Sequence, residues 1–387
     1  MVEWKELKEI FDTRNGYTPS TLNESFWEGG CIPWFKMDDI RDHGRILNDS
    51  YLHITEKAIK GKGLFRANSI LLATSATIGE HALIAVEHLS NQRFTNFYPK
   101  KEYEKKINMR FAYYYMFIID TWCLHHVNQG GFASVDMSGL YKQPFPIPSL
   151  EEQRRIVSIL DTFTSSIENL KEQIVLRRKQ YEYYRDQLLD LEGKPGVEMK
   201  ILKDVFDTRN GYTPSTSNSQ FWDNGIIPWF KMEDIRDNGR ILNDSNLHIT
   251  TSAIKGKGLF KANSIILATS ATIGEHALIT VEHLSNQRFT NFYPKECYLN
   301  IINMKFVYYY MYRIDEWCKQ HINKGGFASV DMGGLNNLLI PIPSPFEQQR
   351  IVDILDKFEE SIQNLEAQLA QREKQYEYYR NKLLTFE

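Results

Sequence analysis

Residues 11–20 read FDTRNGYTPS, and the same ten letters return at 206–215. Later matches keep the same offset of 195 residues. Between 11–99 and 206–294, 75 of 89 aligned positions are identical and no gap is needed. Solenoid repeats have periods of roughly 20 to 50 residues, so this repeat has the size of a whole domain. The sequence therefore predicts one unit written twice, with two copies of one surface about a pseudo-two-fold axis.

Each copy changes in character near its residue 150. The first part mixes glycine, proline and asparagine with short apolar runs such as SILLAT at 69–74, a pattern typical of strands joined by loops. One helix is expected over 108–127. The predicted fold class is α+β, with two mixed α/β domains. The expected divisions are a first globular domain at 1–150, a central helix at 151–192, a junction at 193–195, a second globular domain at 196–345 and a C-terminal helix at 346–387.

The last part of each copy has a heptad pattern. Large, mostly apolar residues recur at alternating spacings of four and three, which is the seam of a coiled coil. The seam positions are Ile156, Leu160, Phe163, Ile167, Leu170, Ile174, Arg177, Tyr181, Tyr184, Leu188 and Leu191, and their repeats from Ile351 to Phe386. An antiparallel pair connects the chain most simply, because the first helix must end where the second domain begins. We therefore expect the two domains at opposite ends of an antiparallel two-helix coiled coil.

The composition, with 42% hydrophobic and 25% charged residues, is that of an ordinary soluble chain. No run approaches the roughly 18 uncharged apolar residues of a membrane helix, and no signal peptide precedes the first domain, so a cytoplasmic protein without membrane contact is expected. The four cysteines lack disulfide or zinc spacing, and buried free thiols are expected. The net charge of −3 argues against binding nucleic acid by bulk charge. However, the two helical segments together carry −5, whereas the globular segments carry 0 and +1.

Several loops of the globular domains hold residue types that contact nucleic acid. Glycine alternates with lysine at 60–63 and 255–258, which suits phosphate contacts, although a solvated turn is the alternative. The segment NQR at 91–93 offers amides that pair with adenine and a guanidinium that pairs with guanine. Small-residue loops at 74–79 and 130–134 are expected to be exposed. Each loop taken singly is more often structural than functional.

No catalytic motif is found. The sequence lacks phosphate-loop, GxSxG and HExxH patterns, and NFYP at 96–99 contains N, Y and P of the methyltransferase NPPY motif only in the wrong order. Asp38 and Asp39 could hold a metal for nuclease chemistry, but the second copy has Glu233 at the first position and no lysine stands in a nuclease-like arrangement. We therefore expect no catalytic residue, no metal and no cofactor in this chain.

Together these segments resemble a known family. GYTPS at 16–20, IPWFKMDDI at 32–40, TSATIG at 74–79 and NQRF at 91–94 are similar to the target recognition domain of type I restriction-modification specificity subunits. PIPSLEEQRRI at 146–156, followed by a long heptad helix and then repeated, is the layout of that family and the most specific part of the resemblance. The resemblance covers essentially the whole chain.

The resemblance implies a non-catalytic subunit that reads a split target in double-stranded DNA. Each recognition domain reads one half of the target, and the two helices space the domains and bind two methyltransferase subunits. Translocating restriction subunits can join such a complex. S-adenosylmethionine is then expected in the methyltransferase partner and not in this chain.

The resemblance also places two sets of residues. Those expected near DNA are Tyr17, Lys36, Arg41, Lys60, Lys62, Ser75, Thr77, Asn91, Gln92, Arg93, Phe132 and Ser134, with their repeats Tyr212, Lys231, Arg236, Lys255, Lys257, Ser270, Thr272, Asn286, Gln287, Arg288, Phe327 and Ser329. Those expected at the methyltransferase junctions are Gln153, Arg154 and Arg155, with Gln348, Gln349 and Arg350.

The sequence departs from the family in one respect. Typical members carry two unlike recognition domains, whereas these two are nearly identical. Two copies of one reader about a two-fold axis read the same half-sequence on opposite strands. We therefore expect an interrupted palindrome, with Asp38 against Glu233 as a source of asymmetry.

Two alternatives remain from the residues alone. A coiled-coil scaffold whose twin domains bind protein partners suits the duplication and the helices equally well. A self-contained nuclease or methyltransferase predicts turnover or cofactor binding by the purified chain alone.

Overall fold

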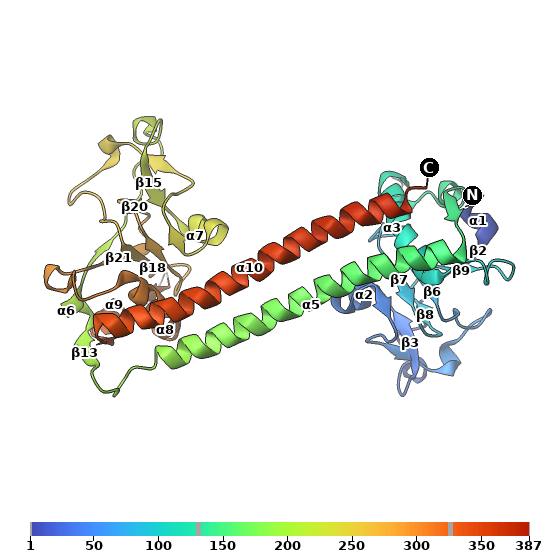
Figure 1. Ribbon diagram of the computed structural model, residues 1–387, viewed down its shortest axis with the longest axis horizontal. Coiled ribbons are helices and arrows are strands. Elements are labelled where there is room, and N and C mark those ends of the chain that lie inside the picture. The colour runs from blue at the N-terminus through green and yellow to red at the C-terminus, as the bar shows by residue number, and fades with distance from the viewer. Residues whose placement is uncertain (1, 129–132, 324–327, 387) are drawn as a thin grey trace. The chain divides into compact units, whose positions relative to one another are not determined.

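The structure is a computed structural model. The described residues are 2–128, 133–323 and 328–386. The chain forms two compact units: unit 1 comprises Met1–Lys171 and Ala367–Glu387, and unit 2 comprises Glu172–Glu366. Each unit therefore holds one globular domain together with part of each long helix (Figure 1).

A five-stranded sheet forms the centre of the globular part of unit 1. Its strands are β2 (Phe11–Asn15), β4 (Ile46–Leu47), β6 (Ser69–Ala73), β7 (His81–Ile84) and β9 (Phe94–Pro99). Their order is β2-β9-β6-β7-β4, and all neighbours are antiparallel except β4 and β7. The strands expected at the apolar runs that begin at Ser69 and His81 are confirmed.

Both faces of this sheet are covered. Every residue of β6 is buried, because its alternating side chains enter two different cores. Ile70 and Leu72 join the core that includes helix α3 (Met109–His125), which confirms the helix expected over 108–127. Leu71 and Ala73 join a second core beneath a three-stranded sheet. The strands of that sheet, in the order β5-β3-β8, are β5 (His53–Ile54), β3 (Ile32–Phe35) and β8 (Leu89–Ser90).

Short elements complete unit 1. The remaining strands form two pairs: β1 (Glu3–Glu6) with β12 (Pro144–Ile147), and β10 (Val127–Asn128) with β11 (Ser134–Val135). The short helices and turns are α1 (Leu7–Ile10), η1 (Glu24–Phe26), α2 (Met37–His43), η2 (Glu56–Ala58) and α4 (Met137–Leu140). Because β12 leads directly into the first long helix, the β1–β12 pair attaches that helix to the globular domain.

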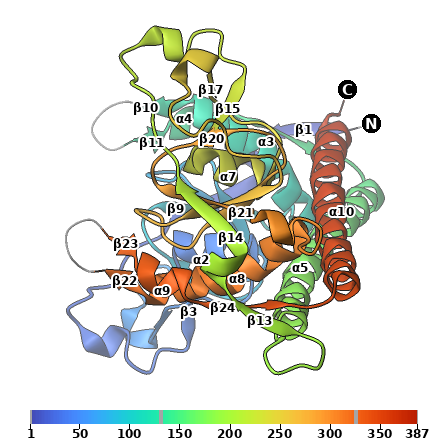
Figure 2. The same cartoon turned by 90° about the vertical axis from the view of Figure 1, so that its left-hand side faces the viewer.

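Unit 2 repeats this arrangement, which confirms the tandem duplication (Figures 1 and 2). Its five-stranded sheet has the order β14-β21-β18-β19-β16 and its three-stranded sheet the order β17-β15-β20. The elements are β13 (Glu198–Ile201), α6 (Leu202–Val205), β14 (Phe206–Asn210), η3 (Ser219–Phe221), β15 (Ile227–Phe230), α7 (Met232–Asn238), β16 (Ile241–Leu242), β17 (His248–Ile249), η4 (Thr251–Ala253), β18 (Ser264–Ala268), β19 (His276–Ile279), β20 (Leu284–Ser285), β21 (Phe289–Pro294), η5 (Glu296–Tyr298), α8 (Met304–Gln320), β22 (Ile322–Asn323), β23 (Ser329–Val330), α9 (Met332–Asn336) and β24 (Leu339–Ile342).

The long helices α5 (Leu150–Leu188) and α10 (Pro345–Leu384) run antiparallel. In unit 1, Phe163 stacks on Tyr379 with ring centroids 5.4 Å apart, and the Lys171 ammonium lies 3.2 Å from Glu373. In unit 1 the residue number therefore rises along α5 as it falls along α10. Unit 2 has the equivalent pairs Tyr184–Phe358 and Arg178–Glu366. The predicted antiparallel coiled coil is therefore confirmed.

The heptad pattern extends further than the helices do. α5 ends at Leu188, so the predicted seam position Leu191 lies in the following loop, where it is buried in the core of unit 2. Phe386 likewise lies beyond the end of α10 and packs edge-on against Phe111 and Trp4 of unit 1, with centroids 6.1 Å and 6.3 Å away. These two residues anchor a helix end to a globular domain instead of pairing helix with helix.

The cysteines are partly as expected. Cys123 and Cys318 are buried free thiols, and burial raises the pKa of each thiol to about 12. The same expectation is wrong for Cys31 and Cys297, which are exposed: Cys31 lies in a loop and Cys297 in the short helix η5, both outside the sheets. In the part of the chain that is described, no helix combines the length and the apolar character needed to cross a bilayer.

A histidine is enclosed at the same place in each unit. His88 and His283 are fully buried, and each donates its Nδ1–H to a backbone carbonyl at 2.9 Å, of Val86 and Val281 respectively. Burial, with a smaller contribution from a nearby arginine, lowers the pKa of each imidazole to about 4. The unfolded chain binds these protons near pH 6.5 and the folded chain only near pH 4, so acid favours unfolding.

We expect this pair of histidines to make stability pH-dependent. Their contribution should be fully present above pH 6.5 and decline as pH falls to about 4, by roughly 3 kcal/mol of unfolding free energy per histidine. Denaturant unfolding at pH 7.5, 5.5 and 4.5 measures the loss. Because glutamine does not titrate, His88→Gln with His283→Gln should flatten this part of the profile. A variant with the wild-type pH slope would contradict the assignment.

Candidate nucleic-acid interface

Loops from distant parts of the chain meet at one side of the globular part of unit 1. The Tyr17 amide donates to the Ser90 carbonyl at 2.8 Å. The Thr18 hydroxyl donates to the side-chain carbonyl of Gln92 at 2.6 Å. The loop after β2 therefore lies against the loop before β9, although the hydrogen-bonded residues are 74 positions apart.

The small-residue loops join the same place. The Thr74 amide donates to the Arg93 carbonyl at 2.9 Å, and Ser75 forms an antiparallel bridge with Ser134. Ser75 and Ser134, which belong to two loops far apart in the sequence, are thus paired. We call this set the recognition edge; it comprises residues 16–18, 36, 74–77, 91–93 and 133–134 of unit 1, and residues 211–213, 231, 269–272, 286–288 and 328–329 of unit 2.

Unit 2 builds its recognition edge with the same bonds. The Thr213 hydroxyl donates to Gln287, the Thr269 amide donates to the Arg288 carbonyl at 2.9 Å, and Ser270 pairs with Ser329. Two predicted DNA-contacting residues, Phe132 and Phe327, lie outside the described residues.

The lysine loop is tied to the recognition edge through Tyr17. The Tyr17 hydroxyl donates to the Ala58 carbonyl at 3.0 Å and accepts from the Lys60 amide at 2.8 Å. The loop is held from its other end by Arg14, whose guanidinium donates to the Gly63 carbonyl at 2.8 Å. Arg14 and its repeat Arg209 were not among the predicted residues. Nothing in the sequence indicates that an arginine in a strand supports a distant loop.

Removal of the loop lysines should weaken DNA binding without changing the sequence that is read. Lys60, Lys62 and their repeats Lys255 and Lys257 are exposed. If each neutralises one phosphate, alanine at all four should reduce the slope of log affinity against log salt by about 0.9 per lysine. Titrations of DNA into the complex of this chain with its methyltransferase partner, at several salt concentrations, measure this slope. Lys101→Ala, at an exposed site beyond the other end of β9, is the control; an equal effect there would contradict the assignment.

Two predicted cations are paired with acids in the isolated chain. The carbonyl that precedes Lys36 accepts the Asn91 amide at 3.1 Å, and the Lys36 ammonium lies 2.8 Å from Asp38. Hydrogen bonding to that carboxylate raises the pKa of Lys36. Arg41 lies 2.7 Å from Glu80. A DNA contact by either cation would therefore require that cation to give up its ion pair. In unit 2 the distances are 3.9 Å for Lys231–Glu233 and 3.1 Å for Arg236–Glu275.

Some of the predicted side chains of the recognition edge are exposed, whereas others are buried or hydrogen-bonded within the protein. The side chains of Gln92 and Arg93 are exposed. The side-chain carbonyl of Asn91 accepts the Arg93 amide at 3.0 Å, so Asn91 shapes the turn. The Thr77 hydroxyl is buried and has no hydrogen-bond partner in the described part of the chain, which argues against the DNA contact predicted for it. The same holds for the repeat, Thr272.

Gln153, at the start of α5, does not have the position predicted for a residue that contacts the methyltransferase. Gln153 is 0% exposed. Its side-chain carbonyl accepts the Asn108 amide at 2.8 Å, and its amide donates to the carbonyls of Lys106 at 2.8 Å and Pro148 at 2.9 Å. Direct contact with a methyltransferase subunit is incompatible with this burial. Gln153 instead fastens the long helix to the segment that begins α3.

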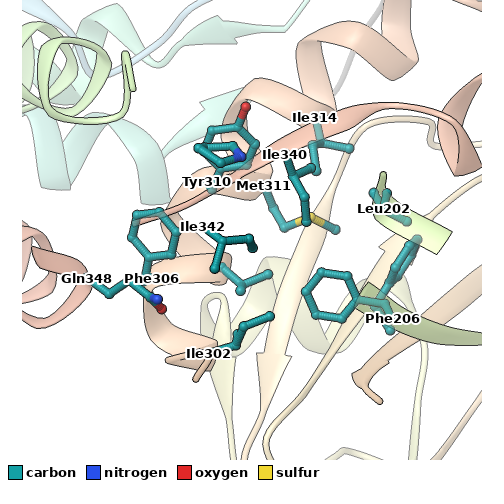
Figure 3. A pocket seen from close by; sticks show the side chains of 13 residues that line it. Leu202, Phe206, Ile302, Phe306, Tyr310, Met311, Ile314, Ile340, Ile342 and Gln348 are labelled. Carbon is teal, nitrogen blue, oxygen red and sulfur yellow. The ribbon is translucent and has the colours of Figure 1, made fainter. Parts of the chain in front are cut away.

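Gln348 has the same role in unit 2. Its carbonyl accepts the Asn303 amide at 2.8 Å, and its amide donates to the carbonyls of Ile301 and Pro343. Figure 3 shows Gln348 beside a cavity lined by apolar side chains, among them Phe206 and Phe306. The cavity holds about 20 Å³, close to the space of one water molecule, so it is a packing void and not a ligand site.

The other predicted junction residues lie at the surface. Arg155 binds Glu152 through two contacts of 2.7 Å and 2.6 Å, and Arg350 binds Glu347 in the same way. Arg154 is exposed. The Gln349 carbonyl accepts from the side chain of Asn303 at 2.9 Å. A partner-binding role for these four residues stays a prediction.

A buried histidine links the sheet of unit 1 to a helix. A buried His81 lies 2.6 Å from Asp120, which also lies 3.3 Å from Arg45, and this network joins β7 to α3. His81 is 0% exposed and cannot reach a substrate. Across residues 2–128, 133–323 and 328–386, no group of three histidine, cysteine or acidic side chains is placed to hold a metal ion.

The comparison with known families accounts for both repeats. A family profile described as "Type I restriction modification DNA specificity domain" matches residues 1–177 and again residues 195–373. The chain therefore belongs to the type I restriction-modification DNA specificity family. This membership does not favour a coiled-coil scaffold for protein partners.

Two relatives from Escherichia coli are similar over long segments. The chain is 49% identical over 216 residues to the type I restriction enzyme EcoprrI specificity subunit, a match that covers 52% of this chain and 53% of the relative. It is 35% identical over 304 residues to the EcoR124I/EcoR124II specificity subunit, which covers 73% of this chain and 72% of the relative. The chain thus spans about half the length of the first relative.

A solved structure shares the fold over nearly the whole chain. It is described as "Structural basis underlying complex assembly and conformational transition of the type I R-M system". The TM-score is 0.68 at 18% identity, and the match covers 99% of this chain and 96% of the other. At this identity the likeness shows the fold alone.

Proposed function

We propose that this chain supplies the DNA sequence specificity of a type I restriction-modification complex. The recognition edge of each unit would read one half of a split target in double-stranded DNA. The observation that carries the proposal is that each edge gathers exposed amide and guanidinium groups, Gln92 and Arg93 in unit 1, on a frame of backbone hydrogen bonds. Family membership supports the same conclusion.

The two halves of the target are proposed to have the same sequence. The positions that differ between 11–99 and their repeats are 22, 24, 25, 28, 29, 31, 38, 43, 51, 56, 57, 66, 71 and 85. None of them belongs to the recognition edge, although Asp38, at one of these positions, pairs with Lys36 of the edge. Two equal readers on antiparallel helices would read opposite strands, which supports an interrupted palindrome as the target.

The chain is proposed to recognise DNA and not to modify it. Two methyltransferase subunits would bind it, and they would carry S-adenosylmethionine and the catalytic groups; restriction subunits would join this assembly. The nearly neutral globular segments support this division, because they leave much of the phosphate attraction to partners.

Methylation mapping tests the proposal. The chain is expressed with the methyltransferase subunit encoded beside it, and modified adenines are mapped across the genome of the host. We expect one interrupted palindrome whose modification disappears when this chain is omitted. Modification that persists without the chain would overturn the proposed function. A motif with two unlike halves would overturn only its symmetry.

A further inference from the structure

The loop at 74–79 holds an alanine in the left-handed backbone region. Ala76 has φ 65° and its repeat Ala271 has φ 64°. The other described non-glycine residues with positive φ are asparagines, namely Asn68, Asn224 and Asn263. Asparagine tolerates this region because its side chain can hydrogen-bond locally, whereas the alanine Cβ crowds the following carbonyl oxygen and gains nothing in return. Glycine would relieve the strain, yet both copies have alanine.

Contacts on both sides of Ala76 impose this conformation. The Thr74 amide donates to the Arg93 carbonyl, and the Thr74 carbonyl accepts the Val135 amide, each at 2.9 Å. The Thr77 amide turns back to the Ser75 carbonyl at 2.9 Å. The loop is thereby fixed from two directions, and the alanine at its tip is exposed in both units.

The strained methyl group lies among groups suited to base edges. Ala76 belongs to the recognition edge, which also holds the exposed side chains of Gln92 and Arg93. A strained conformation that the surroundings maintain is typical of functional positions. The base group that an apolar methyl recognises in DNA is the C5-methyl of thymine, which is displayed only in the major groove.

We propose that Ala76 and Ala271 are specificity-determining residues, each packing its methyl group against the C5-methyl of a thymine in one half-site. The inference rests on the proposed function and names one feature of the substrate. The alanine Cβ is retained because it makes this contact, and the residue that carries it is exposed in both units.

The test removes the methyl group from the protein and from the DNA in turn. The methylation rate of the complex between the full chain and its methyltransferase partner is measured on duplexes that carry the mapped target. In each duplex, one thymine position is changed to deoxyuridine, at the equivalent place in both half-sites. The loss of one buried methyl contact, about 0.8 kcal/mol, corresponds to about a fourfold lower kcat/KM per half-site. The wild type should show this loss at one thymine position.

The variant Ala76→Gly with Ala271→Gly should be insensitive to deoxyuridine at that position. Its melting temperature should equal or exceed that of the wild type, because glycine adopts a positive φ without strain. Ala67→Gly with Ala262→Gly is the matched control, since these alanines precede the opposite end of the same strands and lack a positive φ. The control should keep the wild-type response to deoxyuridine.

The outcomes separate the inference from the function on which it rests. If the wild-type complex methylates no DNA sequence, the proposed function fails. If it methylates its target and the glycine variant responds to every deoxyuridine as the wild type does, the inference alone is overturned. A melting temperature lowered by the glycine substitutions would also overturn it, because the alanines would then not be strained.

Discussion

Replacing Gln92 and Gln287 together by alanine should nearly abolish methylation of the target. Both amides are exposed at the recognition edge, and each is held by a threonine hydroxyl, at 2.6 Å from Thr18 in unit 1. A well-placed amide contact to a base is worth about 2 kcal/mol. Two such losses give a rate reduction of about 1000-fold, measured as kcat/KM on duplexes that carry the target.

The two single variants are the matched controls. If the two readers are equivalent, Gln92→Ala and Gln287→Ala should each cost the same, about 30-fold, and their free-energy losses should add because the sites are independent. Assembly with the methyltransferase subunits, followed by size-exclusion chromatography, should be unchanged in all three variants. Methylation at the wild-type rate in the double variant would show that these loops do not read the target.

Gln153→Leu should destabilise unit 1 more than any surface substitution. The leucine leaves the Asn108 amide and the carbonyls of Lys106 and Pro148 without their partner in a buried junction. At 1–3 kcal/mol for each unsatisfied group, a loss of about 4 kcal/mol is expected. Denaturant unfolding measures the total, and hydrogen exchange of α3 amides should rise because the start of that helix is no longer fixed.

Neighbouring positions separate this structural role from partner binding. Arg154→Leu alters an exposed residue of the same turn and should change stability by less than about 0.5 kcal/mol. Gln348→Leu should weaken unit 2 by the same amount as Gln153→Leu weakens unit 1. If Gln153→Leu kept full stability and lost only the methyltransferase, the original assignment of Gln153 to the partner interface would be restored.

Local periodicity explains why the large features could be predicted from the sequence. The duplication is visible as identity at one offset, and the heptads from Ile156 onward predict a long helix because each position depends only on neighbours three and four residues away. The helix end was misjudged because Leu191 continues the spacing while its side chain enters a globular core. The three-stranded sheet has strands as short as two residues, and long-range pairing alone creates them.

The site was harder to predict, because it depends on contacts between residues that are far apart in the sequence. The types of residue at 91–93 indicated base contacts. Only the fold shows that the side chain of Asn91 is hydrogen-bonded within a turn. The family resemblance placed Gln153 at the methyltransferase junction; its burial depends on Asn108, the N-cap of α3, which lies 45 positions earlier. The conformation of Ala76 leaves no trace in the sequence, since alanine ordinarily favours a helix and rarely adopts a positive φ.

The burial of Leu384 in the core of unit 1 has a consequence for biosynthesis. The first globular domain emerges from the ribosome early, but the segment that completes its core follows some 200 residues later, about 10 to 40 seconds at ordinary rates of translation. Unit 2 is continuous from Glu172 to Glu366 and has all its parts sooner. The half of the protein that is made first is therefore finished last, and a nascent chain that stalls before Leu384 exposes an incomplete first domain to chaperones and proteases.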